Sequence, residues 1–168
     1  MIYGDNAVIV YTQSSAFIWL VLTAVLYGCE TWMLNKRMWA KFQAFQMQCE
    51  HRIVSIKWND CIPNVTVAAT SGLDSIINIA RAYQLGLFGH IARFSHDVPA
   101  SAVFPDMDIP DHSWRCSNGR PRTSWLDHIC SNIGMSLTHT FSLAQHCSQW
   151  RIVAMHRLRI KTDWLRQW

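Results

Sequence analysis

The sequence predicts a mostly α-helical fold, a helical bundle with a Pro-rich loop and a smaller C-terminal helical region. Three observations support this prediction. Apolar residues recur at steps of three and four, helix-capping residues precede these runs, and glycines follow them. Four of the five prolines fall within residues 95–122, a spacing that no helix survives. The strand-like pattern is limited to Ala7–Thr12.

Composition divides the chain into four expected segments. Prolines and aspartates are concentrated in one stretch that lacks apolar periodicity, which is typical of a linker or long loop. The expected segments are an N-terminal stretch 1–15, a larger helical region 16–94, a Pro- and Asp-rich linker 95–122 and a C-terminal helical region 123–168.

Local signals place the first two helices of the larger region. The first is expected from Ala16 to about Tyr27, capped by Ser14 or Ser15 and ended at Gly28. Asn35 caps the second, which carries one apolar stripe at helical spacing. The members of that stripe are Met38, Phe42, Phe45, Cys49 and Ile53.

Two further helices follow in the same region. Asn64 caps a short helix that Gly72 closes, and Ser75 opens a longer one with an apolar face. That face is formed by Ile76, Ile79, Ala80, Tyr83, Leu87 and Ile91. Gly86 and Gly89 interrupt the pattern: they either weaken the helix by about 1 kcal/mol each or allow close contact with another helix.

The C-terminal region begins with a helix whose start is well marked. Ser124 is a good N-cap with Asp127 three positions later, a variant of the capping box, and Gly134 ends the helix. A further helix is expected over Thr138–Gln145. The rest of the chain is a basic, Trp-rich helical tail.

Composition and cysteine spacing limit the classes of protein to which this chain can belong. Half of the residues are apolar and 15% are charged, which excludes wholesale disorder. The net charge of +4 is compatible with a polyanionic partner. Six scattered cysteines without a CxxC pair indicate reduced, mostly buried thiols, so we expect an intracellular protein of the cytoplasm or nucleus.

An uncharged stretch near the N-terminus allows two interpretations. No charged residue occurs from Asn6 to Cys29, but the strongly apolar part, "AFIWLVLTAVLYG", has 13 residues. A membrane span needs about 20 predominantly apolar residues. We therefore favour a buried core helix, and a membrane segment remains the alternative.

Two basic segments are candidates for nucleic-acid binding. In Gly119–Arg122, Gly and Pro hold a short extended segment with two guanidinium groups, which suits a phosphate backbone or a narrow minor groove. The tail combines arginines with tryptophans, as single-stranded nucleic acid requires. The alternative for Gly119–Arg122 is a basic turn before a helix. The alternatives for the tail are a solvated basic helix face and a membrane-surface helix.

The sequence predicts no catalytic residue, no metal site and no cofactor. Two sets of Cys and His were considered as zinc ligands, and neither has the paired short spacing of a structural zinc site. They are Cys49, His51, Cys61 and His90, and His112, Cys116 and His128. Tyr3-Gly4-Asp5-Asn6 is similar to a polymerase metal-binding turn, but one aspartate does not anchor two metals. A frayed turn is the favoured interpretation of these residues.

Five segments, read in order, resemble a known family. They are "LVLTAVLYGCETWMLNKR", "FQAFQMQCEHRIVSIKWND", "LGLFGHIARF", "NGRPRTSWLDHI" and "AQHCSQWRIV", and they cover about Val21 to Val153. The chain resembles the region downstream of the reverse transcriptase core in open reading frames of non-LTR (LINE-type) retrotransposons. The resemblance implies a thumb-like helical region at 16–94, followed by a C-terminal helical region that contacts RNA or DNA.

The chain also departs from that family. The polymerase palm and the endonuclease domain are absent from this sequence, so we expect no enzymatic activity, and residues 1–15 would be a remnant of the palm. Arg81 stands alone before Phe88-Gly89-His90 where the family has several arginines. His51 and Ser55 stand where Arg and Gly are common. This loss of basic charge predicts weak template binding.

The resemblance also implies which residues contact nucleic acid. The expected backbone contacts are Arg93, Arg120, Arg122 and Arg151, with secondary contacts at Lys36, Arg37 and Arg52. The tryptophans that match the family, Trp32, Trp58, Trp125 and Trp150, are expected in the core.

The resulting hypothesis is a non-catalytic fragment of a retrotransposon-derived reverse transcriptase with weak, sequence-independent nucleic-acid binding. Its expected partners are an RNA or DNA backbone and a full-length retrotransposon protein. One alternative is a decayed open reading frame without selected activity, with apolar surface exposed. The other is a small single-pass membrane protein anchored by residues 6–29.

Overall fold

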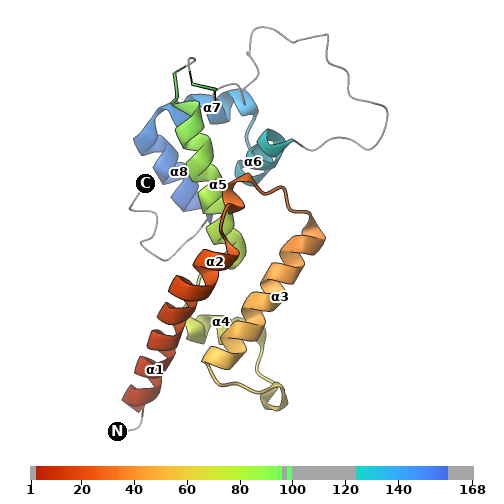
Figure 1. Ribbon diagram of the computed structural model, residues 1–168, viewed down its shortest axis with the longest axis vertical. Coiled ribbons are helices and arrows are strands. Elements are labelled where there is room, and N and C mark those ends of the chain that lie inside the picture. The colour runs from red at the N-terminus through yellow and green to blue at the C-terminus, as the bar shows by residue number, and fades with distance from the viewer. Residues whose placement is uncertain (1–2, 96–97, 100–123, 159–168) are drawn as a thin grey trace. The chain divides into compact units, whose positions relative to one another are not determined.

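The computed structural model describes residues 3–95, 98–99 and 124–158, and these are mostly helical (Figure 1). The helices are α1 (Tyr3–Ala16), α2 (Thr23–Val25), α3 (Lys36–Ile53), α4 (Asn64–Ser71), α5 (Ile76–Ala92), α6 (Trp125–Ile133), α7 (Leu137–Gln145) and α8 (Cys147–Leu158). A π-helical segment, η1 (Phe17–Leu22), joins α1 to α2, and η2 (Cys29–Thr31) and η3 (Trp58–Asp60) are short 3₁₀ turns. No strand occurs among the described residues, so the mostly α prediction is confirmed.

The contacts divide the described chain into two units. The first contains residues 3–29 and 34–80, and the second contains residues 30–33 and the described residues from Arg81 onward. The division therefore falls inside α5, whereas the expected segments divide at residue 95. Of the expected linker 95–122, only residues 95, 98 and 99 are among those described.

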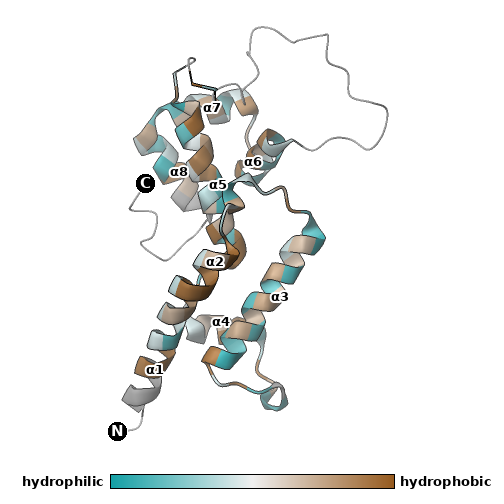
Figure 2. Ribbon diagram, in the orientation of Figure 1, coloured by the Kyte–Doolittle hydropathy of each residue, from teal (hydrophilic) through white to brown (hydrophobic). Residues whose placement is uncertain are grey.

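The N-terminal helix differs most from the sequence prediction. The expected helix start at Ala16 is wrong, because α1 begins at Tyr3, and the strand-like pattern at Ala7–Thr12 is helical. Gly28, at φ +69°, follows the helix as predicted. Figure 2 shows the apolar colour running along α1 and α2. Only 17% of Val8–Val25 is buried. Within the expected helix, Phe17, Leu22 and Leu26 are buried, whereas Trp19, Leu20 and Tyr27 are exposed, so the expected core helix is confirmed on one face only.

Helix α3 starts as predicted but buries a different face. The Asn35 side chain accepts a hydrogen bond from the backbone N–H of Met38 at 2.9 Å and caps the helix. The predicted apolar stripe is exposed at Met38 and Phe45 and half-buried at its other positions. The buried face instead contains Trp39, Gln46 and Glu50.

A buried polar network explains this choice of face. Gln46 Nε2 donates to Glu50 Oε1 at 2.6 Å and to the Asp74 carbonyl at 3.0 Å, and Gln46 Oε1 accepts from the Ile76 amide at 2.7 Å. The Ser71 hydroxyl donates to Glu50 Oε2 at 3.2 Å. Because buried polar groups must be satisfied, these bonds fix α3 against α4 and the start of α5.

The same network reaches α1. The Ser14 hydroxyl donates to the Ser71 carbonyl at 3.1 Å, next to the end of α4. Ser14 is therefore an anchor between two helices, and its expected role as a helix cap is wrong. Gly72, at φ +68°, ends α4 in the left-handed conformation, as predicted. Asn64 is the first residue of α4, and Pro63 occupies the cap position.

The second unit is built around α5. The predicted apolar face of α5 is half-buried at Tyr83 and Leu87 and buried at its other positions, Ile76, Ile79, Ala80 and Ile91, and the helix also buries Leu85 and Phe88. A helix that is apolar on most sides belongs in a core. Three helices, α6 to α8, complete the unit among the described residues (Figure 1).

The capping box of α6 is confirmed. The Ser124 hydroxyl accepts from the Asp127 amide at 3.1 Å, and Asp127 Oδ2 accepts from the Ser124 amide at 3.0 Å. Hydrogen bonds to its carboxyl, first from the Ser124 backbone amide and then from the Ser124 side chain, hold the pKa of Asp127 below its usual range. Gly134, at φ +73°, ends the helix as predicted.

An aromatic cluster occupies the core of the second unit. The Phe88 ring lies 5.3 Å from the ring of Trp150 and 6.2 Å from that of Trp125, centre to centre. Trp150 Nε1 donates to the Leu85 carbonyl at 3.0 Å. A Cβ on Gly89 would lie 2.5 Å from Trp150 Nε1, so Gly89 allows close approach of α8 to α5. The second interpretation of this glycine, close helix contact, is therefore the right one.

Residues 30–33 belong to the second unit through two hydrogen bonds. Trp125 Nε1 donates to the Glu30 carbonyl at 2.9 Å, and Gln84 Nε2 donates to the Trp32 carbonyl at 2.8 Å. The expected core position is confirmed for Trp150, whereas Trp125 and Trp32 are half-buried. The side chain of Trp58 lies outside the described residues.

Candidate nucleic-acid interface

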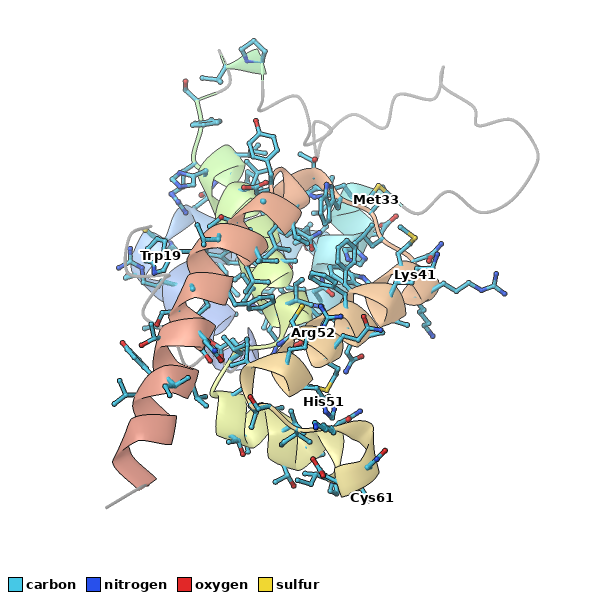
Figure 3. All side chains as sticks on the ribbon, turned by 60° about the horizontal axis from the view of Figure 1, so that its bottom comes forward. Trp19, Met33, Lys41, His51, Arg52 and Cys61 are labelled. Atoms are coloured by element: carbon cyan, nitrogen blue, oxygen red, sulfur yellow. The ribbon has the colours of Figure 1, made fainter. Side chains whose placement is uncertain are left out.

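The exposed side of α3 gathers positive charge. Arg37, Lys41 and Arg52 are exposed, and their spacings of 4 and 11 residues place them on one side of the helix, together with Gln48. Figure 3 labels Lys41 and Arg52 along this helix. We call these four residues the α3 basic face. No ion pair within the described part of the chain neutralises its three cations.

The α3 basic face is long enough for several phosphates. Fifteen residues separate Arg37 from Arg52, which is about 22 Å along a helix at 1.5 Å per residue. That length matches about six or seven nucleotides of one strand of B-form DNA, at about 3.4 Å each. Arginine forms forked hydrogen bonds with phosphate oxygens, and lysine adds a point charge.

An open groove runs beside this face and shares two of its residues. It has a volume of about 740 Å³, and its lining residues are Ala40, Gln43, Ala44, Met47, Gln48, His51, Arg52, Ile56 and Asn64. His51 Nε2 lies 3.1 Å from Asn64 Oδ1, which joins α3 to the start of α4 at the groove. His51 is the one ring among the lining residues, which include no Phe, Tyr or Trp, so the groove offers little surface for base stacking.

The Cys49 thiol, on the same helix, is not activated. Cys49 is half-buried in α3, and burial raises the pKa of its thiol, against the smaller lowering effect of the Arg52 charge. A thiol with a raised pKa carries little thiolate at neutral pH and is a poor nucleophile. The groove therefore fits binding better than nucleophilic catalysis.

Arg93 is exposed but already has a structural partner. One of its terminal nitrogens, Nη1, donates to the Ala144 carbonyl at 2.9 Å, close to the end of α7. This bond satisfies a carbonyl that a helix end leaves without an intrahelical donor. A guanidinium has five N–H donors, so the remaining ones are available for a phosphate.

The other expected contacts are spread over the chain. Arg151 is exposed on α8 next to buried Trp150, and Lys36 is exposed in the first turn of α3. Arg120 and Arg122 lie outside the described residues, as do the side chains of the tail beyond Ala154. The structure therefore brings Lys36, Arg37 and Arg52 onto one helix, and it places Arg93 and Arg151 in the other unit.

Cysteine and metal chemistry has little support in the described part of the chain. No three His, Cys, Asp or Glu side chains there could hold a metal ion. Five cysteines are free thiols, but only Cys29 of these is fully buried, so the expectation of mostly buried thiols is wrong. Cys61 and Cys147 are exposed.

Comparisons with known proteins give no relative. No family model, no curated protein and no solved structure matches this chain. The candidate interface is therefore assigned from the geometry and chemistry of this chain alone.

Two members of the candidate interface were not among the predicted contacts. Lys41 lies four residues after Arg37, and Gln48 lies four residues before Arg52. The i, i+4 spacing places each pair on one helix face and is visible in the sequence. The predicted contacts were taken from motifs of the resemblance, which do not indicate Lys41 or Gln48.

Proposed function

We propose that the chain binds the backbone of RNA or DNA without sequence preference, as a helical part of a non-LTR retrotransposon-type reverse transcriptase. It contributes no catalysis of its own in this proposal. The α3 basic face is the observation that supports nucleic-acid binding. Its three cations are exposed, and none has a carboxylate partner among the described residues. A full-length retrotransposon protein is the proposed protein partner.

The positions of the family-like segments support a shared structural unit. Phe88 and Gly89 from one segment pack against Trp150 from another, and Trp125 from a third contacts Phe88. Arg93 bonds to Ala144, which again joins two segments. Residues far apart in the sequence thus build one core, so the pattern of resemblance follows tertiary contacts.

The chemistry of the groove supports sequence-independent binding. Recognition of single-stranded bases depends on aromatic stacking, and the groove lining includes no Phe, Tyr or Trp, with His51 as its one ring. Cations on an exposed helix contact phosphates, which carry no sequence information. We therefore expect similar affinity for oligonucleotides of different sequence and a strong dependence on salt.

Filter binding with a labelled single-stranded oligonucleotide at low salt tests this proposal. Three phosphate contacts predict a slope of about −2 in log K against log salt, and loss of one contact reduces it by about 0.7. Arg52→Gln should weaken binding and flatten the slope. Lys57→Gln is the matched control, since Lys57 is exposed and lies outside α3, and it removes the same charge.

Three results would count against the proposal. Equal losses in the Arg52 and Lys57 variants would show a general charge effect without an interface on α3. Unchanged affinity after removal of Arg93, Arg120, Arg122 and Arg151 would end the assignment of contacts by resemblance. Incorporation of labelled nucleotides by the purified protein would overturn the non-catalytic part.

The decayed reading frame remains the competing proposal. It is favoured by the large exposed apolar side chains of the first unit, such as Tyr11 and Trp19. Urea unfolding followed by circular dichroism separates the two. A cooperative transition supports a folded binding protein, and its absence supports decay.

A further inference from the structure

We propose that the exposed side of α1, η1 and α2 lies against a lipid bilayer. We call this side the α1 lipid face. Its large exposed apolar residues are Val8, Ile9, Tyr11, Trp19, Leu20 and Tyr27. This proposal does not depend on nucleic-acid binding, because the apolar residues that carry it lie outside the α3 basic face.

Exposure along this stretch is too great for an ordinary core helix. Trp19 is 68% exposed and Leu20 is 74% exposed. Figure 3 places Trp19 on the side of η1 that faces away from α3. Val8–Val25 has a mean hydropathy of 1.7, and it is the stretch among the described helices long and apolar enough to cross a membrane. Contiguous exposed apolar surface marks an interaction site.

The polar groups of the exposed side are suited to an apolar medium. The Thr12 hydroxyl donates to the Val8 carbonyl at 2.9 Å, and the Thr23 hydroxyl donates to the Trp19 carbonyl at 2.6 Å. Both hydroxyls are thus satisfied within their own helix, which removes much of the cost of transfer out of water. No charged residue occurs from Asn6 to Cys29.

Positive charge begins seven residues after Cys29, beyond the half-buried Glu30. Lys36, Arg37 and Lys41 are exposed in the first turns of α3, within the same unit. Basic residues next to an apolar surface helix bind anionic headgroups. A second copy of the chain would gain nothing from these cations, since its own face is uncharged. The uncharged apolar face therefore favours a lipid surface as the occupant, and the cations on α3 add electrostatic attraction to anionic headgroups.

The other side of the helix stays packed on protein. Phe17, Leu22 and Leu26 are buried, and Ser14 is bonded to Ser71. A bilayer that replaces water on the exposed side preserves all of these contacts, whereas a full crossing of the membrane would break the Ser14 bond. We therefore place the α1 lipid face in the membrane interface, parallel to the surface.

Vesicle flotation of the full chain tests the proposal. The probes are vesicles of phosphatidylcholine alone and with phosphatidylserine added. The double variant Trp19→Gln/Leu20→Gln should lower the bound fraction at least about tenfold on both vesicles. Val65→Gln/Ile152→Gln is the matched control, because these residues are 82% and 68% exposed on other helices.

A charge variant tests the headgroup contact. Arg37→Gln/Lys41→Gln should weaken binding to the anionic vesicles by about fivefold per charge, and leave binding to neutral vesicles unchanged. Equal losses in the Trp19/Leu20 and control variants would overturn the proposal. So would light scattering that shows a dimer lost in the Trp19/Leu20 variant. Resistance of the bound protein to carbonate extraction would overturn the interfacial placement in favour of a span.

A failure of the lipid-binding proposal can be distinguished from a failure of the proposed nucleic-acid binding. The Trp19/Leu20 variant keeps the whole α3 basic face, so it should bind oligonucleotide like the unmodified chain. Arg52→Gln should behave in the opposite way: it weakens oligonucleotide binding and leaves binding to neutral vesicles intact. Circular dichroism of each variant shows whether the helices are retained.

Discussion

Gly89→Ala is expected to destabilise the second unit although alanine is the better helix former. The added Cβ would lie 2.5 Å from Trp150 Nε1 and 2.6 Å from Cδ1 of the same ring. Ordinary carbon contacts are about 3.5–4.0 Å, so the indole must retreat by about 1 Å. The indole also donates a hydrogen bond to the Leu85 carbonyl at 3.0 Å, and this retreat lengthens it beyond bonding range.

The free energy of unfolding should fall by about 1–5 kcal/mol, with about 3 as the central value. Overpacking of a core costs about 1–3 kcal/mol. A buried donor left without its partner costs about 1–3 kcal/mol more. Replacement of a mid-helix glycine by alanine returns about 1 kcal/mol. Both unfavourable contributions arise from the contact with Trp150. Together they exceed the gain in helix propensity, so the net effect is destabilising.

Urea unfolding followed by circular dichroism measures this change. A double-mutant cycle with Trp150→Phe identifies its origin, because a phenyl ring lacks the Nε1 and Cδ1 atoms that meet the new Cβ. In the Trp150→Phe background, Gly89→Ala should cost less than about 1 kcal/mol. An alanine variant as stable as the unmodified chain, with Trp150 present, would refute the close contact of α8 with α5.

Three further predictions concern single residues. Ser124→Ala should lower stability by about 1 kcal/mol in urea unfolding, and Ser136→Ala by less, because the second serine makes no capping bond to the backbone. Burial, and then the Arg81 charge, lowers the pKa of His128. The folded state therefore resists protonation, so stability should fall as pH drops through about 6.5, with a flatter profile in His128→Gln. Glu50→Ala should lower the free energy of unfolding by about 3 kcal/mol, since the Glu50 side chain is 1% exposed and accepts from two buried donors. Thermal unfolding measures this change, and an unchanged midpoint would contradict the network.

Local signals in the sequence were sufficient for the ends of several helices. Asn35 and Ser124 cap their helices, and Gly28, Gly72 and Gly134 follow theirs. A cap depends on a side chain and backbone groups within about four residues, so the sequence carries the whole interaction.

The buried face of α3 could not be read in the same way. Its polar members are satisfied by groups far along the chain: Ser71 donates to Glu50, and Gln46 bonds to residues 74 and 76. Apolar periodicity alone selected Met38 and Phe45, which are exposed. Long-range polar partners can reverse a preference based on hydrophobicity, and they become visible only in three dimensions.

The candidate interface was partly predictable. Arg37 and Arg52 were named from the sequence, and their spacing places them on one face of a single helix. The partner of Arg93 was not predictable, because the Ala144 carbonyl comes from a helix 51 residues later in the chain. Exposure of Trp19 and Leu20 was also missed, since an apolar stretch reads the same whether protein or lipid covers it.

The two proposals share Arg37 and Lys41, which leads to a prediction about competition. If phosphates of nucleic acid and of lipid headgroups bind the same cations, an oligonucleotide should displace the chain from anionic vesicles and leave it on neutral ones. Linkage requires the effect to be reciprocal, so anionic vesicles should weaken oligonucleotide binding by the same factor. Arg52→Gln should reduce displacement, because Arg52 lies about 17 Å along α3 from Lys41 and serves the nucleic acid alone. Simultaneous binding of oligonucleotide and anionic vesicles without mutual weakening, measured by flotation with labelled oligonucleotide, would show that the cations are not shared.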